Sequence, residues 1–231
     1  LSPMPFFRKF ISKQPLEILA FLAPLIVIFE IGLVGVLRHG DGSVLTNRAH
    51  LTLLRLFEWS GVRAEALLLP ALSLPAAALI VVLLTWHALS RRSWSVHLPT
   101  VGGMAIESLL TALPLVTIGW IVASLPLAAA PDPRTLGVPA QIAVALGAGL
   151  YEELLFRLAL LSLLHSVFRR IPKCTPAVAT VLAVTISALC FTFYHPVIED
   201  GRLALRTAII LFLAGLWWGT LFVIRGFGIA V

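Results

Sequence analysis

Two glutamates and an arginine interrupt a long apolar run in the stretch YEELLFR, residues 151–157. Most other residues between 138 and 167 are apolar or small, so the charges lie about halfway along a predicted membrane helix. Burying an unpaired charge at that depth costs several kcal/mol. We therefore expect these side chains to have a partner, a water-filled cavity or a chemical task.

The spacing of the three charges separates their predicted roles. Glu153 and Arg157 are four residues apart and can pair on one face of an α-helix. Glu152 points about 100° away from Glu153, so this pairing alone does not neutralise it. A carboxylate left over in a low-dielectric pocket is the usual starting point for a general base, and Glu152 is the candidate.

The composition predicts an integral membrane protein. Of the 231 residues, 59% are hydrophobic and 12% charged, whereas a soluble domain carries roughly 25% charged residues. Nothing indicates a separate soluble domain, so residues 1–231 are predicted to form a single integral-membrane domain. The net charge of +6 comes from short Lys and Arg clusters at the ends of apolar segments, as in topology signals. Without a basic patch interleaved with aromatic residues, we expect no nucleic-acid partner.

Apolar stretches near the length of a membrane span, about 20 residues, recur along the chain. The candidates are Leu16–Leu37, Ala66–Leu89, Ile106–Ala128, Ala140–Val167, Pro176–Tyr194 and Leu203–Ile224. Residues 225–231 resemble a turn and the start of a seventh helix. The predicted fold is all-α: a polytopic membrane protein with about six to seven transmembrane helices plus one interfacial amphipathic helix.

The interfacial helix is predicted over Asn47–Ser60, where apolar residues alternate with charged ones. Trp59 would lie at the membrane surface, as tryptophan does in aromatic belts. The alternative is an ordinary solvated helix in a loop.

The loop charges predict the orientation of the chain. Placing the N-terminus inside puts nine Lys and Arg residues on the cytoplasmic side and seven on the other, which favours a cytoplasmic N-terminus. The richness in Leu, Ala, Val and Arg is compatible with a bacterial inner membrane. Because Val231 stands inside an apolar run, we expect the chain to be truncated there.

His195 ends the fifth apolar stretch, directly before Pro196. A histidine at a helix end is commonly an interfacial residue satisfied by water. A neutral imidazole is also a suitable second partner for a water held by Glu152, and the two groups together could deprotonate that water. The residues alone leave both interpretations open.

Two motifs together resemble those of a known family. Glu152-Glu153-x-x-x-Arg157, followed about forty residues later by Phe191-x-x-x-His195, is similar to the paired motifs of the CPBP intramembrane proteases. This is the CAAX-protease and bacteriocin-processing family, also called the Abi family. The similarity covers about residues 140–231, including the glycines and tryptophans of residues 215–219. Residues 1–137 would be variable helices, and residues 138–231 the motif-bearing ones.

The resemblance implies an intramembrane endopeptidase that hydrolyses a peptide bond of a membrane-tethered protein or peptide. Glu152 would be the general base for a water, and His195 would position and polarise that water. Glu153 and Arg157 would hold the geometry and contact the substrate backbone, with Phe191 in a supporting place. The substrate would be a sorting tail, a lipidated C-terminus or a leader peptide.

We expect no cofactor and no metal ion. Glu152, Glu153 and His195 could ligate zinc, but the sequence has no HExxH and no second histidine at ligand spacing. The family's last motif, a histidine with an Asn or Asp four residues on, would lie beyond Val231.

Two other functions remain open. The first is a non-catalytic membrane scaffold or immunity-type protein that keeps the motifs for structure. The second is a transporter that uses Glu30, Glu107 and the Glu152/Glu153 pair as a relay, although no repeat symmetry supports it. In the structural interpretation, Glu30 is a protonated or hydrogen-bonded residue at a helix contact, and Glu107 pairs with a nearby cation at the membrane interface.

Overall fold

The structure, a computed structural model, describes residues 14–35, 46–62, 73–123, 137–199 and 201–231. Within these residues the chain is helical apart from turns and a hairpin of two-residue strands. By internal contacts it divides into two compact units. The first unit comprises residues up to 105 together with 134–154 and Val231, and the second comprises 106–133 and 155–230.

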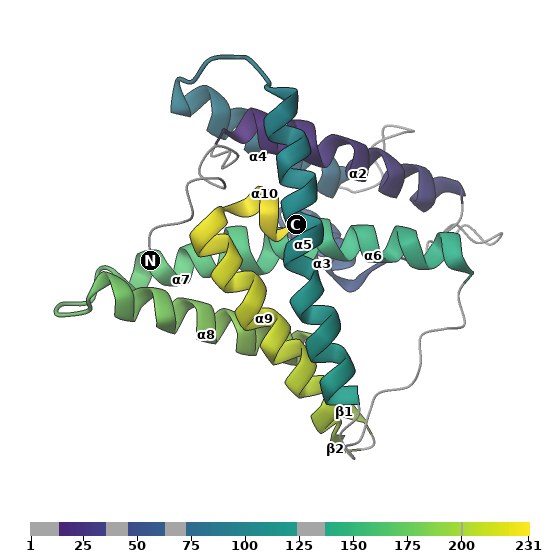
Figure 1. The fold of residues 1–231 in the computed structure, drawn as a ribbon, viewed down its shortest axis with the longest axis vertical. Helices are drawn as coiled ribbons and strands as arrows, with labels where there is room; N and C mark the ends of the chain where they lie inside the picture. Colours follow the sequence, from purple (N-terminus) through teal and green to yellow (C-terminus); the bar gives the residue numbers. More distant parts are fainter. Residues whose placement is uncertain (1–13, 36–45, 63–72, 124–136, 200) are drawn as a thin grey trace. The chain divides into compact units, whose positions relative to one another are not determined.

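The first unit is a cluster of helices (Figure 1). Its members are α2 (Pro15–Gly35), α3 (Arg48–Trp59), α4 (Leu74–Ser90), the beginning of α5 (Leu98–Ala123) and α6 (Val138–Glu153). Both α2 and α3 contact α4 and α6. The C-terminal end of α6, where the two motif glutamates lie, therefore belongs to a packed set of helices.

Small residues allow α2 and α6 to approach closely. A Cβ atom at Gly32 would lie 2.6 Å from the Cβ atom of Ala143, and one at Gly147 would lie 2.3 Å from the Phe29 ring. Contacts of this kind are typical of membrane helices, where close backbone approach replaces the hydrophobic effect as a driving force.

The second unit carries the rest of the motif residues. It holds the remainder of α5, the π-helix η2 (Leu154–Leu161) from residue 155 on, α7 (Ser162–Phe168), α8 (Pro176–Tyr194), β1 (Ile198–Glu199), β2 (Arg202–Leu203), α9 (Leu205–Arg225) and α10 (Phe227–Ala230). In this unit α8 contacts both α7 and α9. Gly215 of α9 approaches α8 so closely that an added Cβ atom would lie 2.9 Å from Ala188.

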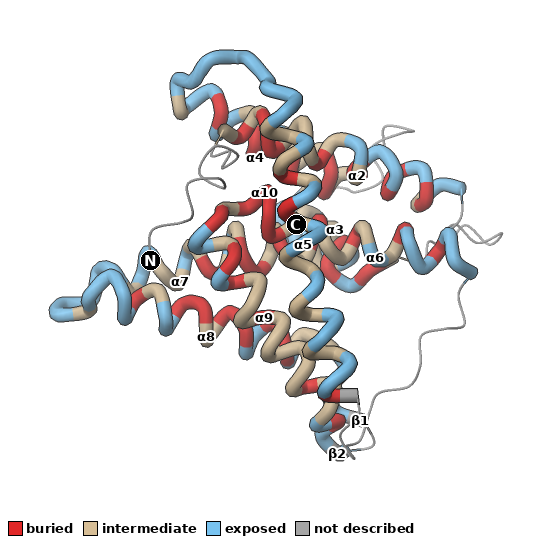
Figure 2. Tube along the Cα trace, viewed as in Figure 1, coloured by how far each residue is buried: buried red, intermediate tan, exposed pale blue. Residues whose placement is uncertain are grey.

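The bounds of α8 follow from its sequence. Thr175 caps the N-terminus by accepting a 3.3 Å hydrogen bond from the Val178 N–H, and Pro176 occupies the first turn. Pro196 disfavours helical geometry at the residue before it, and His195 accordingly has φ −85° and ψ 158°. The helix thus ends with His195 as its C-cap. Figure 2 shows buried and exposed residues interleaved along α8.

A π-helix follows directly after the motif glutamates. From Leu154 to Leu161 the backbone hydrogen bonds join residues five apart instead of four. The expectation of α-helical spacing from Glu153 to Arg157 was therefore wrong, because Arg157 lies in this π-helix. Such segments inside helices are rare and frequently mark functional sites.

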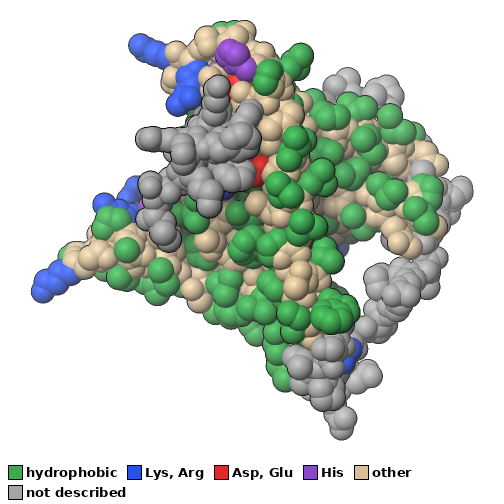
Figure 3. Space-filling view, in the orientation of Figure 1, with side chains coloured by type: hydrophobic (Ala, Val, Ile, Leu, Met, Phe, Trp, Pro, Cys, Tyr) green, Lys and Arg blue, Asp and Glu red, His purple; other side chains and the backbone are tan. Residues whose placement is uncertain are grey.

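Four described helices are long and apolar enough to cross a membrane: Pro15–Gly35, Leu98–Val122, Pro176–Tyr194 and Leu205–Arg225. The apolar α4 is shorter, and α6 has 16 residues before the helix type changes. Large apolar side chains such as Ile31, Leu109 and Val181 are exposed, and Figure 3 shows hydrophobic side chains spread over the visible helix surfaces. The chain is therefore a multi-pass membrane protein, while the count of six to seven spans stays a prediction.

Some predicted bounds differ from the structure. The third predicted span begins at Leu98, eight residues before Ile106, with Pro99 in the first turn, where a proline is tolerated. Part of the predicted span Ala66–Leu89 lies outside the described residues, and its described helix is α4. The single-domain organisation stays a prediction.

The helix predicted over Asn47–Ser60 is present as α3, with Asn47 as N-cap and Ser60 as C-cap. Its Ala49 and His50 are buried, whereas Trp59 is 89% exposed. The helix is therefore two-sided, and its place at the membrane surface stays a prediction.

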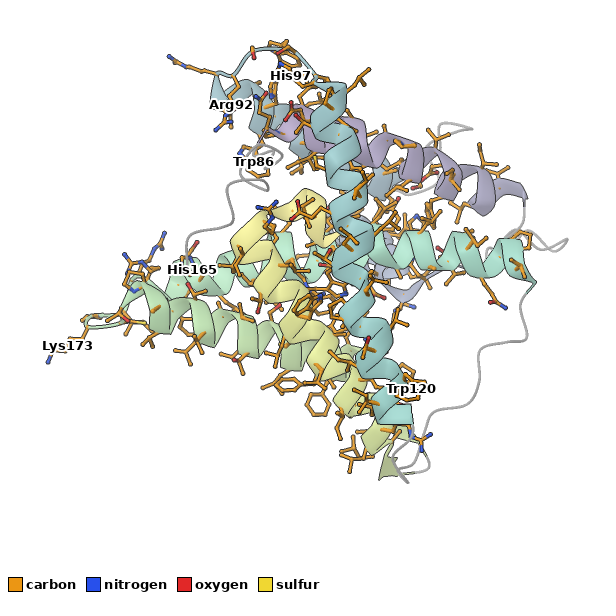
Figure 4. All side chains as sticks on the ribbon, viewed as in Figure 1. Trp86, Arg92, His97, Trp120, His165 and Lys173 are labelled. Atoms are coloured by element: carbon orange, nitrogen blue, oxygen red, sulfur yellow. The ribbon has the colours of Figure 1, made fainter. Side chains whose placement is uncertain are left out.

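Basic residues gather at two turns between apolar helices. Arg91 and Arg92 lie in the turn after α4, and Lys173 lies in the turn between α7 and α8 (Figure 4). All three residues are exposed. The predicted clustering of cations at helix ends is confirmed at these turns, and the orientation across the membrane stays a prediction.

Candidate functional site

The imidazole of His195 has one nitrogen fixed by the end of its own helix. Nδ1 lies 2.8 Å from the carbonyl oxygen of Phe191. Because a carbonyl oxygen only accepts, we infer that Nδ1 carries the proton and donates it. The neutral ring then has Nε2 as its acceptor. The turn of helix between Phe191 and His195 thus sets the tautomer that a water-binding or proton-accepting histidine needs.

Aromatic rings surround this histidine in the second unit. The Phe191 and Tyr194 rings have centroids 4.7 and 5.8 Å from the His195 ring. Phe156 of η2 packs edge-on against Phe191 at 5.3 Å and against Tyr194 at 5.1 Å. These ring contacts fix the Phe191 ring, which packs against the imidazole of His195, while the α8 backbone sets the direction of the Phe191 carbonyl that accepts the hydrogen bond from Nδ1.

Arg157 is the largest fully buried side chain among the described residues. Its guanidinium carbon lies 4.5 Å from the centroid of the Phe191 ring, which is cation–π geometry. The second unit therefore brings together Arg157, Phe191 and His195. All three belong to the two motifs, and they are up to 38 residues apart in the sequence.

The motif glutamates end α6 in the first unit. Glu153 is 5% exposed, whereas Glu152 is partly exposed. The pairing of Glu153 with Arg157, and the sharing of one water between Glu152 and His195, stay predictions.

A third glutamate, Glu30 of α2, lies in a network of neutral donors. Its carboxylate accepts hydrogen bonds from the Ser73 N–H at 2.8 Å and the Ser73 hydroxyl at 2.6 Å. The Tyr151 hydroxyl lies at 3.5 Å. The network joins α2 to the N-cap of α4 and to the residue immediately before Glu152. The structural interpretation of Glu30 is confirmed, but the sequence did not indicate its donors, since they are 43 and 121 residues away.

The buried His50 lies beside this network. Its ring is 5.2 Å from the Tyr151 ring and 5.5 Å from the Phe29 ring. Burial among these groups lowers the pKa of His50 to about 4, because the apolar surroundings disfavour the charged ring. This histidine is therefore neutral at physiological pH.

Glu107 of α5 and Arg225 of α9 form a buried ion pair. The Arg225 Nε and Nη2 groups donate to the two carboxylate oxygens of Glu107, and the residues are 8% and 7% exposed. One turn along α5, the carbonyl of Thr111 accepts a 2.9 Å hydrogen bond from the Trp217 indole. The prediction of a nearby cation for Glu107 is confirmed. That cation is Arg225, which the sequence placed in a loop.

Among the described residues, no group of three or more His, Cys, Asp or Glu side chains could hold a metal ion. The structure therefore offers no metal ligand set in that part of the chain. Metal independence stays a prediction.

Comparison with known families gives one result. Residues 134–231 match the family described as type II CAAX prenyl endopeptidase Rce1-like. The match covers less than half of the chain and includes both motifs. It confirms, over these residues, the resemblance to the CAAX-protease and bacteriocin-processing family. No curated protein and no solved structure matches the chain.

Proposed function

We propose, from the match of residues 134–231 to a family of membrane proteases, that this protein is an intramembrane endopeptidase. It hydrolyses a peptide bond of a membrane-tethered protein or peptide. The observation that carries the assignment of roles is the 2.8 Å contact between His195 Nδ1 and the Phe191 carbonyl oxygen, from which we infer a proton on Nδ1. This tautomer presents Nε2 as an acceptor, which is the form that can bind and polarise a water.

In the proposed reaction, Glu152 accepts a proton from a water that is also hydrogen-bonded to His195 Nε2. The water oxygen attacks the carbonyl carbon of the substrate peptide bond and gives a tetrahedral intermediate. The C–N bond then breaks as the proton held by Glu152 passes to the leaving amine. The products are an amine and a carboxylic acid, which releases its proton to solvent as it ionises, and no cofactor takes part.

The different exposure of the glutamates supports Glu152 as the base. Glu30, Glu107 and Glu153 are all at most 7% exposed. Glu152 is partly exposed on the same kind of apolar helix. A general base must reach water and substrate, so this exposure fits Glu152 better than the others.

Arg157 and Glu153 have supporting roles in this proposal. Arg157 is held against Phe191 and is buried, so in this proposal it holds the geometry of the site together with Glu153. The proposed substrates are a sorting tail, a lipidated C-terminus or a leader peptide. With a cytoplasmic N-terminus, His195 would lie toward the non-cytoplasmic face, which favours exported proteins as substrates.

The test compares membrane-protein termini in the native host for the wild type, Glu152→Gln and His195→Ala. Matched controls are Glu58→Gln, at an exposed glutamate of α3, and His165→Ala, at a histidine of α7. We expect a set of new N- or C-termini to disappear in both test variants and to persist in both controls, at equal protein levels. Termini that persist in all four variants would contradict the protease function and favour a scaffold.

A further inference from the structure

Ser187 uses its hydroxyl differently from two threonines on the same helix. Thr180 and Thr192 of α8 donate to carbonyl groups four residues earlier in α8, at 2.9 and 2.8 Å. These bonds are the ordinary local choice of a hydroxyl on a helix. Ser187, which is 3% exposed, instead donates across to the carbonyl of Phe156 in η2, at 2.8 Å. The bond therefore joins two helices in the protein interior.

The acceptor of this bond lies within the π-helix. The next carbonyl, that of Arg157, is 3.4 Å from the hydroxyl of Ser162. Two consecutive carbonyls of η2 are thus approached by serine hydroxyls. A π-helix is rare because its hydrogen-bond register competes poorly with that of an α-helix. A hydroxyl donor held at a fixed position favours the helical register in which a backbone carbonyl oxygen lies within hydrogen-bonding distance of it.

The two residues held in this way also contact the candidate site. Phe156 packs its ring on Phe191 and Tyr194, and Arg157 lies over the Phe191 ring. The Phe191 carbonyl in turn accepts a hydrogen bond from Nδ1 of His195. A continuous series of contacts therefore runs from the Ser187 hydroxyl, through the backbone of η2, to the imidazole.

We propose that Ser187 is a positioning residue for His195. Its hydrogen bond holds η2 in the π register, and this register keeps Phe156 and Arg157 against Phe191. Phe191 then holds His195 in the tautomer with Nε2 as acceptor. The consequence for catalysis rests on the proposed function, whereas the effect on the imidazole does not.

The physical effect of losing the bond is a change of register. If η2 relaxes to an α-helix, the number of residues in its turns changes. Residues after the altered turn then rotate about the helix axis relative to those before it, by about 100° for each residue that the turn gains or loses. Phe156 and Arg157 would leave the Phe191 ring. Phe191 and His195 would then sample other rotamers, and the imidazole would populate both neutral tautomers.

The test uses Ser187→Ala, which removes the hydroxyl, and Ser187→Cys, which keeps nearly the same volume with a weaker donor. The control is Thr180→Val, which removes a hydroxyl bonded within α8. The protein is labelled with ¹⁵N-histidine, and His195→Gln assigns the His195 signals among the six histidines. Nitrogen NMR then reports which ring nitrogen carries the proton.

We expect a single tautomer, protonated at Nδ1, in the wild type and in Thr180→Val. Ser187→Ala should give a mixture, and Ser187→Cys an intermediate population. For a peptide spanning a cleavage site found by terminal analysis, Ser187→Ala should lower kcat about 10- to 100-fold with a smaller change in KM, as small misplacements of reacting groups do.

Two results would overturn the proposal: a wild-type His195 that is not protonated at Nδ1, or an unchanged tautomer in both folded Ser187 variants. Should Ser187→Ala fail to fold, Ser187→Cys decides the matter, because it preserves the packing volume. Failure of the proposed function is seen separately. In that case no peptide is cleaved by the wild type, but the tautomer still changes when Ser187 is replaced.

Discussion

Glu30 in the first unit and Glu107 in the second are both buried in long apolar helices, yet they are satisfied differently. Glu30 receives hydrogen bonds from the backbone and hydroxyl of Ser73, with the Tyr151 hydroxyl nearby. Glu107 receives two hydrogen bonds from the guanidinium of Arg225. One carboxylate is held by neutral donors and the other by a cation.

Both of these buried acids hold helices together, whereas the proposed function assigns the chemistry to a third acid, Glu152. An ion pair in an apolar interior stabilises only while both partners remain, whereas neutral donors tolerate either charge state of a carboxyl group. Both solutions enclose the acid completely. The partial exposure of Glu152 distinguishes it from them and leaves it able to meet water.

The largest effect is expected from breaking the ion pair. Arg225→Ala leaves the Glu107 carboxylate buried without its cation, so the free energy of unfolding should fall by about 3–5 kcal/mol. Thermal or denaturant unfolding in detergent measures the change, with the exposed Glu58→Ala as control. The double variant Glu107→Leu/Arg225→Met should be clearly more stable than Arg225→Ala. Equal losses in the two would contradict a charge-based explanation.

A smaller loss is expected at Glu30. Glu30→Ala leaves the donors of Ser73 and Tyr151 buried without their acceptor, at a cost of about 2–3 kcal/mol. Glu30→Gln should lose less, because its amide oxygen still accepts one of these hydrogen bonds. The same unfolding measurement applies. A loss for Glu30→Gln as large as that for Arg225→Ala would mean that Glu30 also depends on a charge.

A pH dependence is expected from the neighbouring His50, whose pKa is about 4 in the fold and 6.5 in the unfolded chain. Between these values the unfolded state binds more protons, so stability falls as the pH drops below 6.5 and levels off below about 4. From pH 7 to pH 5 the loss should be about 2 kcal/mol. His50→Gln should remove this part of the slope. An unchanged slope would show that His50 is not buried as described.

The ends of helices could be predicted well because local chemistry sets them. The predicted span Pro176–Tyr194, ending before His195 and Pro196, has the bounds of α8, and the helix predicted over Asn47–Ser60 is α3 with its two caps. The motif residues Arg157, Phe191 and His195 were likewise predicted to act together, and the second unit brings them into contact.

The π-helix and the long-range partners could not be predicted. Apart from Arg157 and Ser162, residues 154–164 are all apolar, so they show no periodicity that could distinguish one helical register from another. The sequence also does not tell which helices are neighbours, so the hydrogen-bond partners of Glu30 and Glu107 could not be identified from it. The close packing of Gly215 on Ala188 was missed for the same reason, although the glycines themselves were noted.

The central claim is that Glu152 and His195 act on one water, and a double-variant comparison tests it most directly. Cleavage of an identified substrate peptide is measured for the wild type, Glu152→Gln, His195→Ala and the double variant. Each single change should lower kcat by about 10²- to 10⁴-fold. The double variant should be about as impaired as the worse single one, because residues that act as a unit are not additive. Losses that multiply would mean that the two side chains act independently, and would contradict the account.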